Sequence, residues 1–233
     1  MIKIKKSTPS NEIIKLLESE KLKKSGTYRH GIIIDQIEKD FYKKCYLCEI
    51  KDLTSINVEH FKPHKNDLDL KFDWNNLYYS CGHCNNIKLS KYDNILDPLT
   101  DDVENLISYH YQGFHVSQPV TIEHNIDNTI DENTKEKVES TVDLLNNIYN
   151  GTTHIKSKES HNIRKEIIKE INSFRQDIDE LEEAIDYEDE ETIKSSLTSI
   201  KRHLHKASKF TAFKRQLIKD IPDLYELFGR FID

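Results

Sequence analysis

Four cysteines form the clearest chemical pattern in this chain of 233 residues, and they fall into two pairs, Cys45-Tyr-Leu-Cys48 and Cys81-Gly-His-Cys84. A spacer of two residues lets both thiolates of a pair reach one ion, and four sulfurs suit a tetrahedral Zn²⁺. Because the chain has no other cysteine, the pattern predicts one structural zinc site. Redox-active pairs or unrelated buried thiols are the alternatives, and disulfides are disfavoured in a reducing compartment.

A site closed by four thiolates has no open coordination position, so the zinc is expected to hold the fold together and leave chemistry to other residues. Candidates lie between and just after the cysteine pairs. Glu59-His60 follows an apolar, β-branched run that predicts a strand, and Asn76 begins a second strand-like run. Asn85 and Lys88 follow the second pair on an expected helix, where positions i and i+3 share a face.

These residues predict two strands and a helix joined by a zinc ion. A carboxylate, a histidine and an amide are expected to meet at one site on this unit. The constellation resembles the HNH endonucleases, whose ββα-metal fold carries an acidic residue before a histidine, a middle Asn and a final His or Asn. This chain has an HNN version with Glu in place of the commoner Asp. The runs CYLCE, EHFKP, DWNNL, SCGHCNNIK and LDP resemble more specifically the PtuB family, the zinc-containing HNH nuclease subunits of Septu-type anti-phage systems, also found with certain retrons. The similarity covers about residues 45 to 98 and is much weaker in the helical remainder, including SKFTAFKRQLIKD.

The resemblance implies a metal-dependent endonuclease that hydrolyses phosphodiester bonds. His60 would be the general base that takes a proton from water, a task suited to imidazole because its ordinary pKa lies near neutrality. Glu59 and Asn85 would hold Mg²⁺ or Mn²⁺, hard ions that prefer oxygen ligands. Asn76 would orient the loop that carries His60, and Lys88 would contact a phosphate.

Each of these assignments has a plainer alternative. Glu59 could be a solvated strand residue, and Lys88 could be a surface lysine. Asn75 and Asn76 could both be turn formers, and only the place before the second strand favours Asn76. Asn85 could merely cap the helix that follows the second cysteine pair.

Two further histidines lie close to these residues. His83 lies inside the second cysteine pair, but four thiolates already fill a zinc sphere. It is therefore interpreted as a neighbour of the zinc ligands or as a group that faces the substrate. His64 either contacts a phosphate or has no role.

Two functions without catalysis compete with the nuclease. A zinc module could bind nucleic acid through its lysines without cutting it, which predicts salt-sensitive binding; these lysines are Lys62, Lys65, Lys88 and Lys91. A scaffold protein could use the zinc module and the helices only to join other proteins. The pair Glu59-His60 favours the enzyme, since neither alternative needs it.

The expected fold is mainly α with a small α+β module. Its parts are an N-terminal helical arm (1–43), the HNH ββα-metal nuclease module (44–100), a hairpin and linker with a turn at Gln112-Gly113 (101–130), and a C-terminal helical bundle (131–233). Helices are expected at 11–24, 33–43, 135–149, 157–187, 192–205 and 209–219, with a last short one from Pro222.

One apolar stripe makes the helix at 157–187 the clearest in the chain. Its members recur at steps of three and four residues: Ile163, Ile167, Ile171, Phe174, Ile178, Leu181 and Ile185. The simplest interpretation is packing between helices of one bundle. A docking surface for a partner helix is the alternative.

The net charge of -7 conceals an uneven distribution: +5 in residues 1–65, -5 in 66–119, -11 in 120–196 and +4 in 197–233. The basic ends could face a polyanion while the acidic middle faces another protein or solvent. Uneven surface charge without any partner is the alternative.

The resemblance implies two partners. One is nucleic acid, either DNA or, as the retron branch leaves open, tRNA. The other is a companion ATPase of the Septu type, similar to PtuA, on which the N-terminal arm or the acidic bundle would dock. Any ATP dependence must come from that other chain, because this sequence has no Walker A pattern.

The composition, with 36% hydrophobic and 32% charged residues, is that of a globular protein. No apolar run approaches the roughly 18 residues that span a bilayer, and the start MIKIKKSTPS lacks the apolar block of a secretory signal. The expected location is therefore the cytosol, with no membrane partner.

Overall fold

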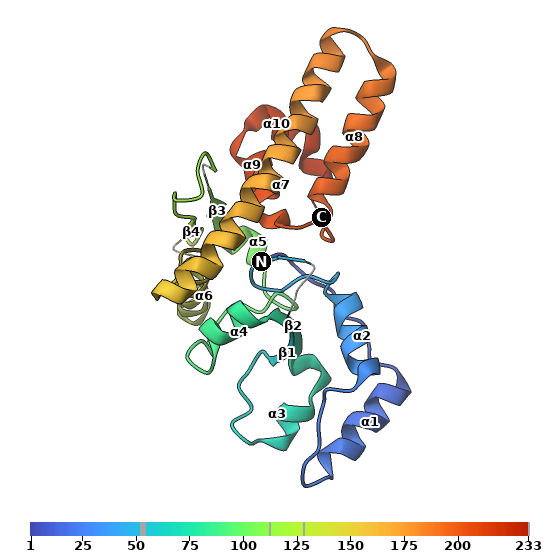
Figure 1. Ribbon diagram of the computed structural model, residues 1–233, viewed down its shortest axis with the longest axis vertical. Coiled ribbons are helices and arrows are strands. Elements are labelled where there is room, and N and C mark those ends of the chain that lie inside the picture. Colours follow the sequence, from blue (N-terminus) through green and yellow to red (C-terminus); the bar gives the residue numbers. More distant parts are fainter. Residues whose placement is uncertain (52–54, 112, 128, 233) are drawn as a thin grey trace.

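The structure is a computed structural model that describes residues 1–51, 55–111, 113–127 and 129–232. Its described part is mainly helical and carries two small sheets of two strands each. The mainly α class expected from the sequence is therefore confirmed. Figure 1 shows the N-terminal helices and the first sheet at one end and a pair of long antiparallel helices at the other.

The first two helices are α1 (Asn11–Lys21) and α2 (Gly31–Asp40), as the apolar spacing predicts. Ser10 caps α1 by accepting a hydrogen bond from the Ile13 amide at 3.3 Å. Both helices end about three residues before the expected points. After α2 the backbone takes the left-handed conformation at Tyr42 and Lys43, which ends the helix and turns the chain toward the first cysteine pair.

A strand, a strand and a helix follow in the order that the sequence predicts. Strand β1 (Ile56–His60) pairs antiparallel with β2 (Leu77–Cys81), and helix α4 (Gly82–Lys88) continues directly from β2. The register places Ile56 opposite Cys81 and His60 opposite Leu77. The connection between the strands holds α3 (Leu68–Phe72) and a short 3₁₀ turn, η1 (Trp74–Asn76). His60 therefore lies at the end of the sheet away from the second cysteine pair.

A second sheet occupies the expected hairpin segment. After the short helix α5 (Val103–Leu106), strand β3 (Ile107–His110) pairs antiparallel with β4 (Thr121–His124). The connection runs through residues 111–120, so the predicted tight turn at Gln112-Gly113 does not join the strands. Gln112 itself lies outside the described residues.

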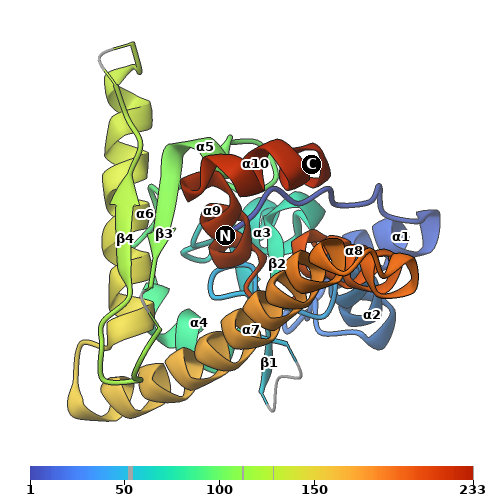
Figure 2. The ribbon, with the colours of Figure 1, turned by 90° about the horizontal axis from the view of Figure 1, so that it is seen from above.

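Helix α6 (Glu132–Asn150) explains where the second strand begins. Its Asn150 side chain bonds both the amide and the carbonyl of Val120, at 2.9 and 2.8 Å. One turn earlier, Asn146 does the same for Ile122 at 3.1 and 3.0 Å. These amides satisfy backbone groups along the outer edge of β4, and Figure 2 shows β3 and β4 beside α6.

The remaining helices are α7 (His154–Asp186), α8 (Glu190–Leu204), α9 (Thr211–Asp220), α10 (Pro222–Phe228) and the 3₁₀ turn η2 (Gly229–Phe231). Six of the seven stripe residues of α7 are buried, which confirms that the stripe packs inside the molecule. The seventh, Ile185, is 51% exposed.

Helix α7 joins two apolar cores. Its first half contributes Ile163 and Ile167 to a large cluster that also contains the four cysteines, both sheets and α6. Its second half contributes Phe174 and Leu181 to a smaller cluster with α8, α9 and α10. Helix α6, which follows the predicted domain boundary at residue 131, has its buried face in the large cluster. Among the described helices, none is long and apolar enough to cross a bilayer.

Candidate functional site

The four cysteine side chains meet at one point inside the protein. Cys45 and Cys48 lie in the turn after α2, and Cys81 ends β2, where its sulfur accepts the Cys84 amide at 3.4 Å and so caps α4. All four are buried, and their sulfur atoms lie within 4.8 Å of one another. The Cys48 and Cys81 sulfurs are 3.8 Å apart.

This geometry fits zinc and excludes disulfides among the four thiols as placed. A tetrahedral ion with Zn–S bonds of 2.3 Å has sulfur–sulfur edges of about 3.8 Å, whereas a disulfide needs about 2.05 Å. Burial opposes ionisation of Cys45, yet hydrogen bonds from the other three thiols lower its pKa well below the ordinary value. The cluster can therefore hold a zinc ion, as its spacing predicts.

The side chain of His60 is held by one backbone contact. Its Nε2 lies 3.0 Å from the carbonyl oxygen of Lys71. Because a carbonyl only accepts, the proton is on Nε2 and the lone pair is on Nδ1. The rings of Tyr28 and His64 each contact the imidazole with centroids 4.6 Å away. Burial lowers the pKa of His60 below its ordinary value, which favours the neutral ring that a general base requires.

Asn76 organises the loop that follows His60. Its amide oxygen accepts the Lys62 N–H at 2.7 Å, and its amide nitrogen donates to the carbonyls of Lys62 and Leu70, both at 2.9 Å. The residue is buried, whereas its neighbour Asn75 is exposed. Asn76 is thus more than a turn former, and it makes the kind of contact that the resemblance implies for the middle Asn. Its part in catalysis stays a prediction.

Glu59 is a buried residue rather than a solvated one. It is 7% exposed, and its Oε1 lies 2.7 Å from the Lys88 ammonium and 3.1 Å from the Tyr46 hydroxyl. Its Oε2 has no hydrogen-bond partner among the described residues. Burial raises the pKa of Glu59, and the Lys88 charge opposes that rise.

Lys88 is neither a surface lysine nor a group that faces a phosphate. It is 1% exposed, and its ammonium also donates to the carbonyls of Phe61 at 2.9 Å and His60 at 3.3 Å. One side chain of α4 thus binds three successive residues at the end of β1. The sequence placed Lys88 beside the site but predicted neither its burial nor its partner Glu59.

Asn85 lies one helical turn before Lys88 on α4. Cys81 is the residue that caps this helix, so the capping role considered for Asn85 is wrong. Within the described part of the chain its side-chain amide makes no hydrogen bond, and the residue is half-buried.

His83 joins the second cysteine pair to the helical part of the protein. Its Nδ1 lies 2.7 Å from a Glu159 carboxylate oxygen on α7, and its Nε2 lies 2.8 Å from the Ile148 carbonyl on α6. Both ring nitrogens are therefore engaged, and the side chain is 8% exposed. His83 therefore neighbours the four-cysteine cluster, and its ring faces α6 and α7. The other histidine considered near the site is His64, whose Nδ1 accepts a hydrogen bond from the Asn66 amide at 3.2 Å.

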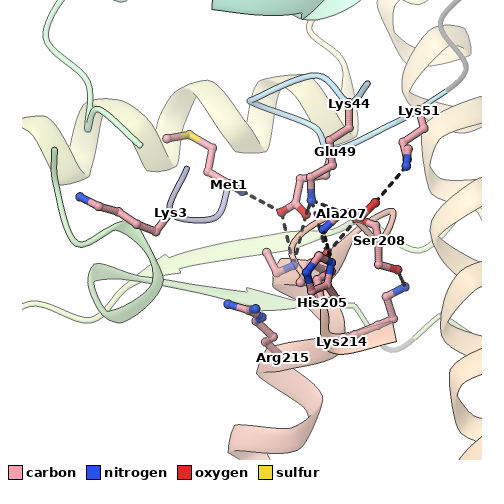
Figure 3. Close-up of polar contacts among 12 residues, drawn as sticks. Met1, Lys3, Lys44, Glu49, Lys51, His205, Ala207, Ser208, Lys214 and Arg215 are labelled. Carbon is pink, nitrogen blue, oxygen red and sulfur yellow. Dashed lines mark hydrogen bonds and ion pairs between the residues drawn. The ribbon is translucent and has the colours of Figure 1, made fainter. Parts of the chain in front are cut away.

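A buried ion pair flanks the first cysteine pair, and the sequence analysis missed it. Lys44 and Glu49 are each 1% exposed and lie 3.0 Å apart. Although burial opposes its ionisation, the charges of Lys44 and of the Met1 amine hold the pKa of Glu49 at about 2. Both carboxylate oxygens also accept the Ala212 amide at the start of α9, so this pair attaches the first cysteine turn to α9 (Figure 3). Contact across this distance in sequence leaves no local signal.

Two side-chain oxygens could serve as ligands of the divalent ion that the resemblance implies. Mg²⁺ and Mn²⁺ prefer oxygen donors, and the unpartnered Oε2 of Glu59 is a buried donor of that kind. The amide oxygen of Asn85, on α4, is a second oxygen of a type that these ions accept. Lys88 already neutralises the other oxygen of Glu59.

His60 and Glu59 are thus successive residues at the end of β1, and the His60 ring contacts Lys71, Tyr28 and His64 while the Glu59 carboxylate contacts Lys88 and Tyr46. The four cysteines form the one group of three or more His, Cys, Asp or Glu ligands found in residues 1–51, 55–111, 113–127 and 129–232. Comparison of the chain with protein-family models and with curated proteins gives no match.

Proposed function

We propose that this protein is a metal-dependent HNH endonuclease that hydrolyses phosphodiester bonds of a nucleic acid. The observation that supports it most is the state of His60. Its Nε2 is bound to a carbonyl, which leaves the Nδ1 lone pair for a proton of the attacking water. His60 follows the buried Glu59 in a strand–strand–helix unit that also contains two of the four clustered cysteines.

In the proposed reaction, Nδ1 of His60 takes a proton from a water molecule. The water oxygen attacks the phosphorus atom, the bond from phosphorus to the 3′ oxygen breaks, and that oxygen is protonated by solvent. Glu59 and Asn85 would hold Mg²⁺ or Mn²⁺, which when bound stabilises charge on the phosphate and on the departing oxygen. Asn76 keeps the backbone after His60 in place by its three hydrogen bonds.

Lys88 serves as a positioning residue in this proposal. Its ammonium joins Glu59 to the carbonyls of His60 and Phe61, and this fixes the end of β1 relative to α4. It also compensates a carboxylate that would otherwise be buried without a counter-charge.

The resemblance to PtuB supports a wider proposal, that the nuclease is the effector of an anti-phage complex with a Septu-type ATPase. Either DNA or tRNA would be its substrate. The acidic surface of α7 and α8 and the N-terminal arm, residues 1–43, are the regions proposed to contact the ATPase. Copurification of the chain with its genomic neighbour tests this part.

A second candidate function is a zinc module that binds nucleic acid without cutting it. The observation in its favour is the ion pair between Glu59 and Lys88 at 2.7 Å, because a carboxylate neutralised by lysine needs no metal ion. This function predicts salt-sensitive binding with no divalent-ion-dependent cleavage.

A cleavage assay distinguishes the two functions. The purified chain is incubated with supercoiled plasmid, single-stranded DNA and tRNA, with added Mg²⁺ or Mn²⁺ or with neither. Omission of the ion is preferable to a chelator, which would also remove zinc from the four thiolates. Cutting of at least one substrate only with added ion is expected. Binding to these substrates without any cutting, with and without the ATPase, would leave the second function.

A further inference from the structure

Residues 205–210 form a short loop between α8 and α9, and basic side chains from other segments hold it by hydrogen bonds. Four cationic groups donate hydrogen bonds to it or to the residue before it, and Figure 3 shows three of them, Lys44, Lys51 and Lys214, beside the loop. The four bonds are Lys44 to the Ser208 carbonyl at 3.0 Å, Lys51 to the Ala207 carbonyl at 3.0 Å, Lys214 to the Ser208 hydroxyl at 2.7 Å, and Arg215 to the Leu204 carbonyl at 2.9 Å. Lys44, Lys214 and Arg215 are themselves buried. The backbone of the loop is therefore preorganised before any ligand arrives.

Two cavities open beside this loop, and both are lined by cations. The first has a volume of about 750 Å³ and is lined by Lys51, Lys201, Arg202, His203, His205 and Lys209, among others. The second has about 470 Å³, and its basic residues are Lys3, Lys5, Lys6, Lys206 and Arg215. Consecutive loop residues thus contribute to different cavities, His205 to the first and Lys206 to the second.

The balance of charge at the two cavities is opposite to that of the whole protein. They are lined by nine Lys or Arg residues and by two carboxylates, Glu170 and Glu104. Both carboxylates are already paired with buried cations, Glu170 with Lys214 at 3.3 Å and Glu104 with Arg215 at 2.8 Å. The chain as a whole carries a net charge of -7. A concentration of positive charge on an acidic protein is typical of a surface that receives an anion.

Three of the cations are well placed to meet a ligand. Lys201 and Arg202 are exposed on the last turn of α8, and Lys206 is half-buried in the loop. Within the described part of the chain, no ion pair joins any of the three to a carboxylate. Cations repeated over two neighbouring cavities match a ligand with repeated phosphates better than a single phosphate.

We infer that the loop of residues 205–210 and its two cavities bind the phosphate backbone of a nucleic acid. This inference rests on the proposed function and extends it, because it names where the nucleic acid is held away from His60. Lys44 and Lys51 enclose the first cysteine pair in sequence and bind the loop directly. The binding surface is therefore attached to the same zinc-held unit that carries His60.

The test compares two double substitutions that change the net charge equally. Arg202→Glu with Lys206→Glu reverses two charges at the cavities. Lys165→Glu with Lys194→Glu reverses two exposed charges on α7 and α8 outside them. Binding of the full chain to a fluorescent DNA duplex and to tRNA is measured by anisotropy at several NaCl concentrations, without Mg²⁺ or Mn²⁺.

At the cavities, the double substitution should weaken binding at least ~10-fold at 0.1 M NaCl. It should also reduce the slope of log K against log salt by about 2 on duplex DNA, since each phosphate contact contributes about 0.9. The control pair should bind within about twofold of the unmodified chain, on the same physical basis. Equal weakening by both pairs, or none at the cavities, would overturn the inference.

Two further arms separate related outcomes. The first adds AMP at the same phosphate concentration as the DNA. Competition by AMP would show that the cavities bind a small phosphate ligand, and it would overturn the inference that they bind a nucleic-acid backbone. Cleavage by the unmodified chain is measured in parallel. Loss of binding at the cavities, with no cleavage by the unmodified chain either with or without the ATPase, would sustain this inference and defeat the nuclease. Cleavage with binding independent of the loop would do the reverse.

Discussion

At the scale of single residues, Asn76 shows how one side chain determines the shape of a loop. It bonds both backbone polar groups of Lys62 and the carbonyl of Leu70 while almost fully buried. A hydrophobic residue of similar size would remove all three hydrogen bonds, and one such bond contributes about 0.5–1.5 kcal/mol to stability.

Replacing this side chain therefore gives a sharp test, Asn76→Ala against Asn75→Ala. The first should lower the free energy of unfolding by about 2–4 kcal/mol, because three hydrogen bonds of a buried side chain are lost. The second changes an exposed neighbour and should alter it by less than about 0.5 kcal/mol. Urea unfolding followed by circular dichroism measures both. Equal effects of the two substitutions would contradict the role assigned to Asn76.

For the candidate site, spacing in the sequence predicted which residues lie there better than it predicted the contacts that their side chains make. The two CxxC pairs predicted the cysteine cluster, and the place before β2 distinguished Asn76 from Asn75. The burial of Lys88 was not predictable, because its direction depends on a carboxylate 29 positions earlier in the chain. The pair Lys44–Glu49 was missed for the same reason, since its burial comes from α9, more than 160 residues later.

At the scale of elements, apolar periodicity predicted every long helix, and long-range contacts determined where the second sheet forms. The stretch after β3 contains β-branched and aromatic residues, and these indicated a tight hairpin. The returning strand begins instead at Thr121, because Asn146 and Asn150 of α6 bind the adjacent backbone. A pattern in the hairpin itself could not reveal a partner helix that begins at Glu132.

The junction between α6 and α7 depends on one glycine. Gly151 ends α6 with φ +82°, and a Cβ there would lie 2.5 Å from backbone atoms of Ser157. Gly151→Ala should cost at least about 1–3 kcal/mol of stability, from left-handed strain and from the clash. Gly31→Ala is the matched control at the first residue of α2, where a Cβ meets nothing within 4 Å.

The control substitution should be neutral or stabilise by up to about 1 kcal/mol, because alanine restricts the unfolded chain more than glycine does. Thermal unfolding of both variants makes the comparison. If Gly151→Ala changes stability no more than Gly31→Ala does, the junction at Gly151 does not determine the direction of α7.

At the scale of the whole molecule, segments far apart in sequence meet around α9. The basic ends of the chain, which the charge distribution had separated by an acidic middle, line one cavity together through Lys3 and Lys206. Beneath the neighbouring cavity, Lys214 is fully buried against Glu170, His203 and Ser208. Burial lowers the pKa of Lys214 to about 8.

This burial predicts a pH-dependent contribution to stability. The folded protein releases the Lys214 proton near pH 8, whereas the unfolded chain holds it to about pH 10.4. Between these values the unfolded state binds more protons, so stability rises with pH. Relative to Lys214→Met, the unmodified protein should gain about 2 kcal/mol from pH 7.5 to pH 10. Urea unfolding of both proteins at each pH measures the difference, and an unchanged difference would contradict the burial of a charged lysine at this position.

The nuclease proposal depends above all on His60, and one comparison tests it most directly. Cleavage rates are measured with Mg²⁺ or Mn²⁺ for the unmodified chain, for His60→Ala and for His161→Ala, a control at an exposed position on α7. Zinc content and unfolding are measured for all three. The proposal predicts a loss of at least about 100-fold for His60→Ala, as for removal of a general base, with zinc retained and with the control unaffected. Cleavage by His60→Ala at the rate of the unmodified chain would contradict it.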